Sequence, residues 1–584
     1  MANHFPTLAL RPRYLPNVWD GLAFALVLGA LLLVLHGGRQ TLVPLETLQQ
    51  AAISLDPSRL PEYALRTTLR MLAGIVASLI FTFLYGALAA KSRRAEIVLI
   101  PILDILQSVP VLGFLTFTVT GFMALFPGQV LGAELASVFA IFTSQAWNMT
   151  FSFYQSLKTV PHDLDEASRS FRLTAWQRFW RLEVPFSMPG LVWNTMMSMS
   201  GAWFFVVASE AVQVGDTTFT LPGVGAYVAI AIKRRNLAAV GWAVLAMLIV
   251  IIIYDQLLFR PLVAWSEKFR VELSASATVP RSWLLSIIRR ARLFQLVFSP
   301  LEKVLESLPR QRLAVRMGDQ STTAGRFWTD ARAVWMSTWV DRIWIAIVVA
   351  FTAYSLWAIY RYIATELVWS EAGRVFVLGL ITLVRVVVLI ALASVIWVPI
   401  GVWIGLRPRV AERVQPLAQF LAAFPANIIF PFAVVVIVHF GLNQDIWLSP
   451  LMILGTQWYI VFNVIAGASA FPNDLKECAS SFRIHGWSWW KQVILPGIFP
   501  YYITGAITAS GGSWNASIVA EVATWGDTTL KAHGLGAYIA DATAAGDFPR
   551  EVLGIAVMSL YVVLFNRLLW RPLYAYGARR LRLD

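Results

Sequence analysis

Long apolar runs separated by short polar segments dominate the chain. Two of these runs are GLAFALVLGALLLVLHGG (21–38) and VGWAVLAMLIVIIIYDQLLF (240–259). A helix needs about 20 apolar residues to cross the ~30 Å hydrocarbon core of a membrane. Because only helices and closed barrels satisfy their backbone groups there, runs of this length indicate helices. The pattern predicts an all-α polytopic membrane protein.

The apolar runs predict about twelve spans. We expect the first run to be a retained span, since a long segment precedes it and no small-residue cleavage pattern ends it. The expected spans are 18–36, 67–90, 95–123, 133–156, 187–209, 237–259, 341–363, 375–405, 411–440, 449–468, 497–520 and 551–570.

The distribution of charge along the chain indicates only how the chain is oriented in the membrane. Hydrophobic residues make up 58% of the chain and charged residues 14%, with a net charge of +14. If both termini lie in the cytoplasm, most basic polar segments lie there too, as the positive-inside rule requires. These segments are 91–94, 157–185, 260–342, 407–413, 472–496 and 571–584. The charge therefore gives no reason to expect nucleic acid as a partner.

Cys478 is the only cysteine, and the six histidines show no metal-ligand spacing. We therefore expect no disulfide within the chain. We also expect no metal site and no cofactor in this chain.

Two stretches of sequence recur at fixed offsets. Around each second span the offset is 315 residues, as for Arg70 and Arg385, and beyond the third span it is 311, as for Glu210 and Glu521. The segments VASEAVQVGDTTFTLPGVGAYVAIA (207–231) and VAEVATWGDTTLKAHGLGAYIADA (519–542) match in the same way. Each half thus carries six spans that begin and end on the same side, which predicts two parallel repeats with a translocation path between them.

The expected domain boundaries follow from the repeat. The first repeat covers 1–265, the second covers 341–584, and a basic linker covers 266–340. Within the linker, 281–298 has apolar and basic residues at helical spacing. A basic amphipathic helix on the inner membrane surface and a plain solvated tether both fit this stretch.

Each half also contains one polar segment that the apolar pattern does not explain. DEASRSFRLTAWQRFWRLEVPFSMPG begins at Asp165, and KECASSFRIHGWSWWKQVILPGIFP begins at Lys476. We expect a short helix over 166–176, with prolines breaking the chain before it re-enters the membrane. A short polar helix held between two spans suits the transmission of a push from a cytoplasmic partner.

These segments resemble the EAA motif of ABC-importer permeases, in which Glu-Ala-Ala is followed by Gly and then by Ile-x-Leu-Pro. The resemblance implies a type I importer fold and two coupling helices, within 163–189 and 474–500, that dock on ATPase subunits. The GDTT and G-x-GAY elements resemble the nitrate, sulfonate, taurine and bicarbonate branch of the family. The implied coupling residues are Glu166, Ala167, Ser168, Phe171, Arg172, Trp176 and Pro185, and Glu477, Cys478, Ala479, Phe482, Arg483, Trp487 and Pro496.

This chain departs from the motif at its glycine, which is replaced by Arg172 and Arg483. An arginine can continue a helix where a glycine would bend it, so we expect an uninterrupted helix at this point.

The chain contains no Walker-type phosphate loop. By resemblance, it is not an enzyme; ATP and Mg²⁺ would bind to two separate cytoplasmic ATPase subunits. A periplasmic or lipid-anchored binding protein would deliver a small solute, expected to be an anion such as nitrate, a sulfonate or bicarbonate. The resemblance also implies a place in a bacterial inner membrane, where membrane lipids would surround the spans. The alternative is a secondary transporter driven by an ion gradient.

Polar and aromatic side chains within the spans are candidates for the path. Arg70 and Arg385 suit either attraction of an oxyanion or anchoring at the membrane interface. Glu210 and Glu521 suit either a gate that meets the binding protein or a solvated helix end. The remaining candidates are Asp104 in the third span, and Asn194, Trp203, Trp514 and Asn515 on the fifth spans, which line the path in the family.

Overall fold

The structure of the protein is a computed structural model of the 584-residue chain. It describes residues 17–39, 53–108, 111–214, 217–269, 282–291, 293–300, 307, 323–469, 471 and 473–580.

Helices form nearly all of the first half. In chain order they are α1 (Val18–Arg39), η3 (Pro57–Arg59), α3 (Leu60–Phe81), η4 (Thr82–Gly86), α4 (Ala87–Lys91), α5 (Arg93–Ser108), η5 (Val111–Phe114), α6 (Leu115–Leu125), α7 (Val130–Lys158), α8 (His162–Ser170), α9 (Ala175–Arg178), η6 (Phe179–Glu183), α10 (Val184–Ser209), α11 (Val224–Lys233), α12 (Leu237–Tyr254), η7 (Asp255–Phe259), α13 (Arg260–Ser266) and η8 (Glu267–Phe269). A hairpin of β1 (Ala211–Val214) and β2 (Thr217–Thr220) follows α10.

The second half repeats this order. After α14 (Trp283–Arg290) and α16 (Thr323–Glu366) come α17 (Trp369–Gly405), α18 (Pro408–Ala423), η9 (Ala426–Ile429), α19 (Phe430–His439), α20 (Gln444–Trp447), α21 (Ser449–Leu454), α22 (Gln457–Ser469), α23 (Asn473–Ser481), α24 (Gly486–Trp489), η10 (Trp490–Ile494), α25 (Leu495–Ala520), α26 (Leu535–Ala545), α27 (Phe548–Phe565), η11 (Asn566–Trp570) and α28 (Arg571–Arg580). Its hairpin consists of β3 (Val522–Trp525) and β4 (Thr528–Lys531).

The all-α membrane fold is confirmed, but the spans are fewer and less regular than expected. Among the described residues, eight helices are long and apolar enough to cross a membrane, or nine if the pair 444–454 and 457–469, bent by 45°, is one span. The expected continuous spans 95–123 and 411–440 are wrong, because each is broken in the middle. In the second half the reason is Pro425, which holds the preceding Phe424 in an extended conformation with ψ 126°.

The linker also differs from the sequence prediction. The expected helix 281–298 is interrupted: α14 ends at Arg290, and a second helical stretch covers 293–300. Ile287 and Ala291 pack against Ala23 of α1, and the Asp20 carboxylate accepts hydrogen bonds from the backbone N–H groups of Leu293 and Phe294. This part of the linker is therefore docked on the first helix.

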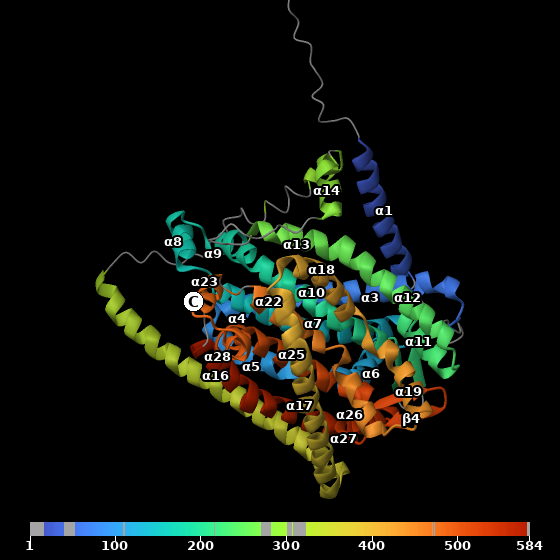
Figure 1. The fold of residues 1–584 in the computed structure, drawn as a ribbon. Helices are drawn as coiled ribbons and strands as arrows, with labels where there is room; N and C mark the ends of the chain where they lie inside the picture. Colours follow the sequence, from blue (N-terminus) through green and yellow to red (C-terminus); the bar gives the residue numbers. More distant parts are fainter. Residues whose placement is uncertain are drawn as a thin grey trace, which may run out of the picture.

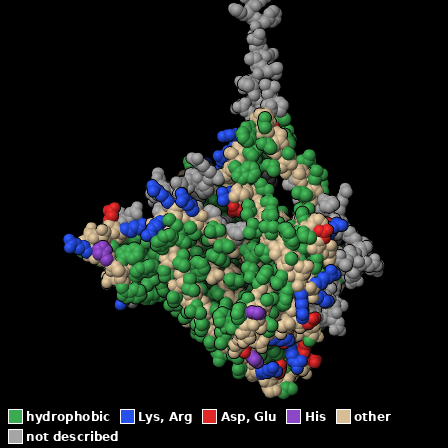
Figure 2. All heavy atoms as spheres, turned by 45° about the vertical axis from the view of Figure 1, so that its right-hand side comes forward, with side chains coloured by type: hydrophobic (Ala, Val, Ile, Leu, Met, Phe, Trp, Pro, Cys, Tyr) green, Lys and Arg blue, Asp and Glu red, His purple; other side chains and the backbone are tan. Residues whose placement is uncertain are grey.

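The bundle has two distinct ends (Figure 1). The polar helices α8 and α23 lie with the C-terminal end of the chain at one end, while α11, α19 and β4 lie at the other. Hydrophobic side chains cover the middle of the molecular face in Figure 2, and charged side chains gather toward its edges. This distribution is the one expected of a protein surrounded by lipid.

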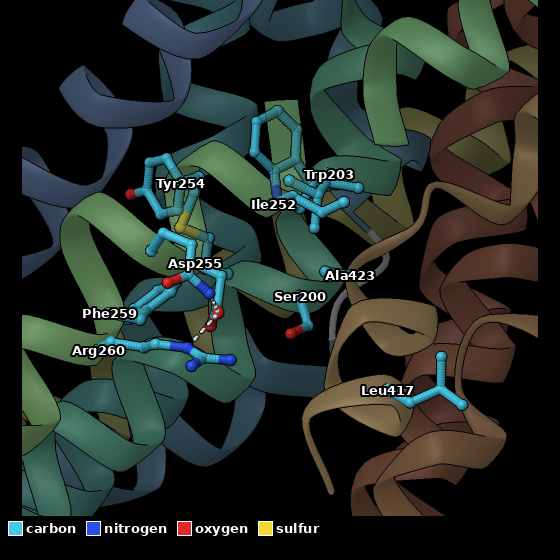
Figure 3. Close-up of a pocket in the computed structure, with 12 residues that line it drawn as sticks. Ser200, Trp203, Ile252, Tyr254, Asp255, Phe259, Arg260, Leu417 and Ala423 are labelled. Carbon is cyan, nitrogen blue, oxygen red and sulfur yellow. Dashed lines mark hydrogen bonds and ion pairs between the residues drawn. The ribbon is translucent and has the colours of Figure 1, made fainter. Parts of the chain in front are cut away.

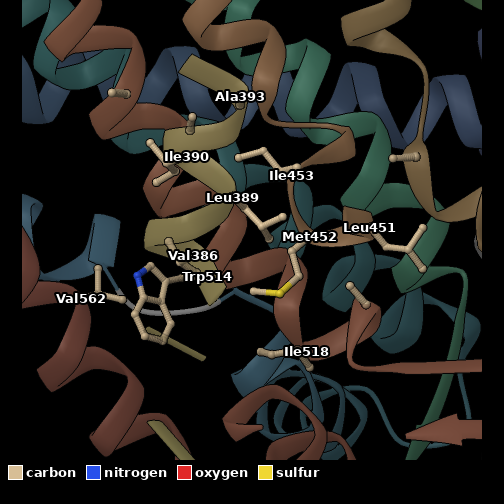
Figure 4. Close-up of a cluster of buried hydrophobic side chains, with 14 of the residues drawn as sticks. Val386, Leu389, Ile390, Ala393, Leu451, Met452, Ile453, Trp514, Ile518 and Val562 are labelled. Atoms are coloured by element: carbon tan, nitrogen blue, oxygen red, sulfur yellow. The ribbon is translucent and has the colours of Figure 1, made fainter. Parts of the chain in front are cut away.

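The largest buried cluster consists mainly of side chains of the second half, with a few from η5, α6 and α7 of the first. Figure 4 shows Val386, Leu389 and Ile390 of α17 facing Met452 of α21 and Trp514 of α25. Trp514 stacks on Tyr561 of α27, and in the first half Trp203 packs edge-on against Tyr254. The fifth helix of each half is thus anchored into its own bundle by an indole.

A buried ion cluster ties three helices together at the hairpin end of the first half. The guanidinium of Arg70 on α3 donates to both carboxylate oxygens of Glu134 on α7, at 2.6 and 2.7 Å, and to Glu210 at the end of α10, at 2.7 Å. Glu210 also accepts from the hydroxyl of Thr67 and from the backbone N–H of Gly225, both at 2.7 Å. With side chains only 4%, 11% and 0% exposed for Arg70, Glu134 and Glu210, the charges satisfy one another out of water.

The second half repeats the cluster with one change. Arg385 donates to Glu521 at 3.1 Å and to Asp445 at 3.2 Å, and Thr382 donates to Glu521 at 2.9 Å. Asp445 stands where the first half has Glu134, and it also contacts His533. We refer to these two groups as the arginine clusters.

The G-x-G pattern of both halves follows from the arginine clusters. A Cβ atom at Gly223 would overlap the carboxylate of Glu210, and one at Gly534 would overlap that of Glu521. A Cβ atom at Gly225 would overlap the backbone carbonyl of Val207. The glycines let the helix after each hairpin approach the end of the fifth helix closely.

Removal of a carboxylate from an arginine cluster should destabilise the protein. We expect Glu210→Ala to lower the free energy of unfolding by about 3 kcal/mol, because Arg70 then stays buried with only one of its two carboxylates. Denaturant unfolding of the detergent-solubilised chain measures the change. Asp527→Ala, which removes an exposed partner of Arg235, is the control and should change little; equal losses in both variants would contradict the role of burial.

The glycine at the carboxylate can be tested separately. Gly223→Ala should lower the melting temperature, since its methyl group displaces the Glu210 carboxylate from Arg70. Gly241→Ala is the matched control, because a Cβ atom there meets nothing within 4 Å. If both variants melt like the parent chain, the close approach at Gly223 has no energetic importance.

Candidate functional site

Each polar segment forms a helix, a tight turn and a second short helix. In the first half α8 leads into α9, and the π-helical turn η6 joins α9 to α10. Thr174 caps α9, and its hydroxyl accepts a hydrogen bond from the backbone N–H of Gln177. In the second half α23, α24 and η10 lead into α25 in the same order.

The expectation of an uninterrupted helix over 166–176 is wrong. Arg172 and Arg483 each have a φ of +52°, in the left-handed region that favours glycine. α8 ends at Ser170, and α9 begins only at Ala175. The two arginines thus adopt the backbone conformation that the motif's glycine would supply, and the chain bends in spite of the substitution.

The residues for which the resemblance implies a coupling role fall into an exposed set and an inward set. Ser168 of α8 and Ala479 of α23 are buried on the inner side of their helices. Trp176 is half-buried against Trp180. The exposed residues are Glu166, Ala167, Phe171, Arg172, Glu477, Cys478, Phe482, Arg483 and Trp487. Phe171 and Phe482 are 80% and 74% exposed, so each turn presents an aromatic ring to its surroundings. Pro185 and Pro496 lie in the first turn of α10 and α25.

The two segments are held to the bundle by different chemistry. In the first half Asp165 of α8 pairs with Arg178 at 3.1 Å, Arg178 lies 3.6 Å from Glu183, and Glu183 pairs with Lys91 of α4. In the second half, the residue that corresponds to Glu183 is the buried Ile494. At this position an ion pair holds the first segment, whereas apolar packing of Ile494 holds the second.

The broken third span of each half reaches the fifth helix of the other half. The Asn515 side chain on α25 accepts a hydrogen bond from the backbone N–H of Val111 in η5, at 2.6 Å. In return, the Asn427 amide of η9 donates to the carbonyl of Phe204 on α10, at 3.3 Å. We call the contact of α10 and α25 with these inserted turns the seam.

The outer hairpins cross the seam as well. Gly526, in the turn between β3 and β4, donates to the carbonyl of Ile232 in the first half at 3.0 Å, and Asp527 pairs with Arg235. β1 of the first half lies against α26 of the second. Each half therefore contacts the other at two levels, through the inserted turns and through the outer hairpins.

A small cavity of about 60 Å³ lies in the seam. Four aromatic side chains from both halves line it, Phe204, Phe205, Phe424 and Tyr459, together with the hydroxyl groups of Ser200 and Thr456. None of the described residues that line it carries a charge. A Cβ atom at Gly201 would lie 2.6 Å from the Tyr459 hydroxyl, so the aromatic ring of one half closes against a bare backbone of the other.

The structure brings some of the candidate path residues to the seam and not others. Asn515 lies in it, whereas Asn194 donates to Ser152 within its own half. Trp203 and Trp514 are fully buried in their own bundles. The backbone of Asp104 lies in α5, and its side chain is outside the described residues.

The expected roles of Arg70, Arg385, Glu210 and Glu521 need correction. They are neither snorkelling anchors nor solvated helix ends, because all four are buried or nearly buried in the arginine clusters. In this conformation they do not face the cavity, and a solute in the seam would not meet them.

Sequence reasoning missed the seam residues Tyr459 and Asn427. Each differs from its repeat counterpart, Asn148 and Leu112. A comparison of the positions that match between the two repeats does not single them out. The difference between the repeats at these two positions was itself a signal of a seam residue.

A family described as "Binding-protein-dependent transport system inner membrane component" matches the chain twice, over residues 82–260 and 397–582. The two matches cover the polar segment, the fifth helix and the hairpin of each half.

Three individual relatives are each less than 30% identical to the chain over the aligned residues. The chain is 28% identical over 186 residues to the bicarbonate transport system permease protein CmpB of Synechococcus elongatus, which is 32% of this chain and 64% of that protein. It is 27% identical over 187 residues to the nitrate import permease protein NrtB of Leptolyngbya laminosa, covering 32% and 63%. It is 28% identical over 197 residues to the glycine betaine/carnitine transport permease protein GbuB of Listeria monocytogenes, covering 33% and 63%.

Each of these alignments thus spans less than two thirds of the relative's own length. The twofold family match covers more than half of this chain, and the repeated helices and hairpins show how the two copies are built. The chain belongs to the family of binding-protein-dependent transport system inner membrane components, with two copies of the family's domain fused in one polypeptide.

Proposed function

We propose that this chain is the membrane subunit of an ATP-driven importer. Two cytoplasmic ATPase subunits dock on the segments 162–178 and 473–489, and a substrate-binding protein delivers a small solute to the hairpin end. Closure of the ATPases moves the two segments, and the seam then opens to one side of the membrane at a time. The chain itself carries out no covalent chemistry.

The observation that carries this proposal is the pair of exposed helix–turn–helix segments. They occupy equivalent positions in the two halves, lie at the same end of the bundle, and bend at the same left-handed arginine. The second short helix of each segment continues without a break, through a π-helical turn, into the fifth helix that forms the seam. A force applied to the segment is thus transmitted to the seam through a continuous helix.

The small-anion class of solute comes from the relatives, two of which are named for bicarbonate and nitrate. The uncharged seam is compatible with passage of an anion, because hydroxyl donors hold an anion without trapping it as a buried cation would. Charge selection then belongs to the binding protein.

Purification of the tagged chain from its host tests the class of transporter. We expect an ATPase to copurify at two copies per chain, with ATP hydrolysis in the isolated complex. A chain that purifies alone and takes up solute in response to an ion gradient would contradict the proposal.

The exposed glutamates of the segments test the docking sites. Glu166→Arg and Glu477→Arg should each reduce the recovery of the ATPase, because each reverses one charge on the expected docking face. Asp541→Arg, a charge reversal at the hairpin end, is the control. Undiminished uptake by the double variant would exclude docking through these residues.

The left-handed arginines give a conformational test. Arg172→Gly should preserve ATPase docking, since glycine adopts φ +52° without strain. Arg172→Val should impair it, because a β-branched side chain disfavours this conformation and would alter the angle between α8 and α9. The measurement is the amount of ATPase recovered per chain, and a valine variant that docks as well as the glycine variant would show that the bend is unimportant.

The contact of Gly201 with Tyr459 gives a test of the seam. Gly201→Val should reduce solute uptake more than ATPase recovery, because the added side chain occupies the place of the Tyr459 hydroxyl. The double variant Gly201→Val with Tyr459→Ala should restore part of the uptake. Absence of any rescue would mean that the two residues do not meet during transport.

A further inference from the structure

A second and larger cavity, of about 220 Å³, lies between the two halves (Figure 3). Its first wall comes from α10 and from the helix that runs through α12, η7 and α13. Its second wall comes from α18 of the other half, at Leu417 and Ala423. Ser200 of α10 lines both this cavity and the seam cavity, so the two lie on neighbouring faces of the same helix.

The cavity has an apolar part and a polar part. Ile251, Ile252 and Phe259 line it together with Leu417, and Ile252 and Leu417 are 46% and 57% exposed. These exposed side chains face the lipid that surrounds a membrane helix. The polar part is formed by Asp255, Gln256 and Arg260. Figure 3 shows Asp255 and Arg260 on one side of the cavity, below Tyr254.

The polar part lies at the depth of lipid headgroups. α12 begins at Leu237 at the hairpin end, and 23 residues of helix separate it from Arg260, a rise of about 35 Å. Since the hydrocarbon core is ~30 Å thick, Arg260 reaches the opposite interface, while Ile251 and Ile252 remain within the hydrocarbon. The cavity is therefore placed to hold an acyl chain next to its own headgroup.

The polar part offers both signs of charge. Arg260 Nε donates to Asp255 Oδ2 at 3.0 Å, and the Gln256 amide donates to the same oxygen at 3.4 Å. Among the described residues, neither the second oxygen of Asp255 nor the terminal guanidinium nitrogens of Arg260 have a hydrogen-bond partner. A carboxylate oxygen is thus free to accept, and a guanidinium is free to bind a phosphate.

The second half lacks this arrangement. Asn566 and Arg567 stand at the positions of Asp255 and Gln256, whereas Arg571 matches Arg260. The arginine is common to both halves, but the acid beside it is specific to the first half.

We propose that this cavity binds one phospholipid with an ethanolamine headgroup. The phosphate accepts hydrogen bonds from Arg260, and the ammonium group, which has three N–H donors, donates to the free oxygen of Asp255. A phosphatidylglycerol headgroup has the phosphate without the ammonium, and a choline headgroup has no N–H to donate. The acyl chain lies along Ile252 and Leu417 and so bridges the two halves next to the seam.

The linker takes part in this site. The indole N–H of Trp283, at the start of α14, donates to Gln256 at 3.1 Å, and Gln256 in turn binds Asp255. The lipid therefore also holds the linker helix in place, through the side chain that orients the carboxylate.

Native mass spectrometry of the full-length chain tests the proposal. The chain is exchanged in detergent against equal amounts of phosphatidylethanolamine, phosphatidylglycerol and phosphatidylcholine. We expect one phosphatidylethanolamine to be retained per chain in preference to the other two. Asp255→Asn should reduce that preference roughly tenfold, because it removes the charge-assisted acceptor, and should leave phosphatidylglycerol retention unchanged.

Two further variants complete the test. Asp541→Asn makes the same chemical change at the hairpin end, where Asp541 pairs with Lys531, and should keep the preference. Leu417→Trp fills the cavity from the second half without altering a charge, and should displace the lipid even if Asp255→Asn does not fold. Equal or stronger retention of phosphatidylglycerol, an unchanged preference in the Asp255→Asn or Leu417→Trp chain, or retention of no lipid at all would each overturn the proposal.

Discussion

A buried arginine between carboxylates is the interaction on which the rest of the architecture depends. In each half it joins the second helix to the end of the fifth, and the fourth-span region supplies the other acid. Lipid gives helices little reason to associate through hydrophobicity, so a charge that must be neutralised fixes their relative position more strongly than apolar contact does. The same carboxylate accepts a backbone N–H from the first turn of the helix that follows the hairpin, and this bond helps to fix the position of the hairpin.

Small residues then decide where the helices can meet. Gly74 faces Ile141, Gly505 faces the backbone carbonyl of Tyr459, and Gly201 faces the Tyr459 ring, so backbones approach closely both within and between the halves. The buried charge pairs lie within each half at the hairpin end, whereas the close approach of the two halves at Gly201 involves no charged side chain.

The sequence predicted what repeats locally. The apolar runs located most of the helices, and the matched offsets revealed the two halves. The expected breaks at Pro185 and Pro189 are wrong, because both prolines lie inside the unbroken helix 175–209, and the polar segment bends at Arg172 instead. The sequence did not predict the arginine clusters, because Glu134 lies 64 residues from Arg70, and no local pattern shows that the two side chains meet. It also gave a wrong conformation for Arg172. Its left-handed φ accompanies the hydrogen bond from Leu173 N–H to the Ser168 carbonyl that closes α8, and it opposes the intrinsic preference of the residue.

The fusion of the halves affects how the seam between them can evolve. In a transporter built from two identical chains, every residue beside the axis occurs twice, and a substitution there alters the opening on both sides at once. Here Tyr459 faces Gly201, whereas the corresponding position of the first half is Asn148 and its glycine counterpart is Gly512. A single substitution in the fused chain therefore alters one side of the seam cavity and leaves the other side unchanged, so the two sides can evolve independently.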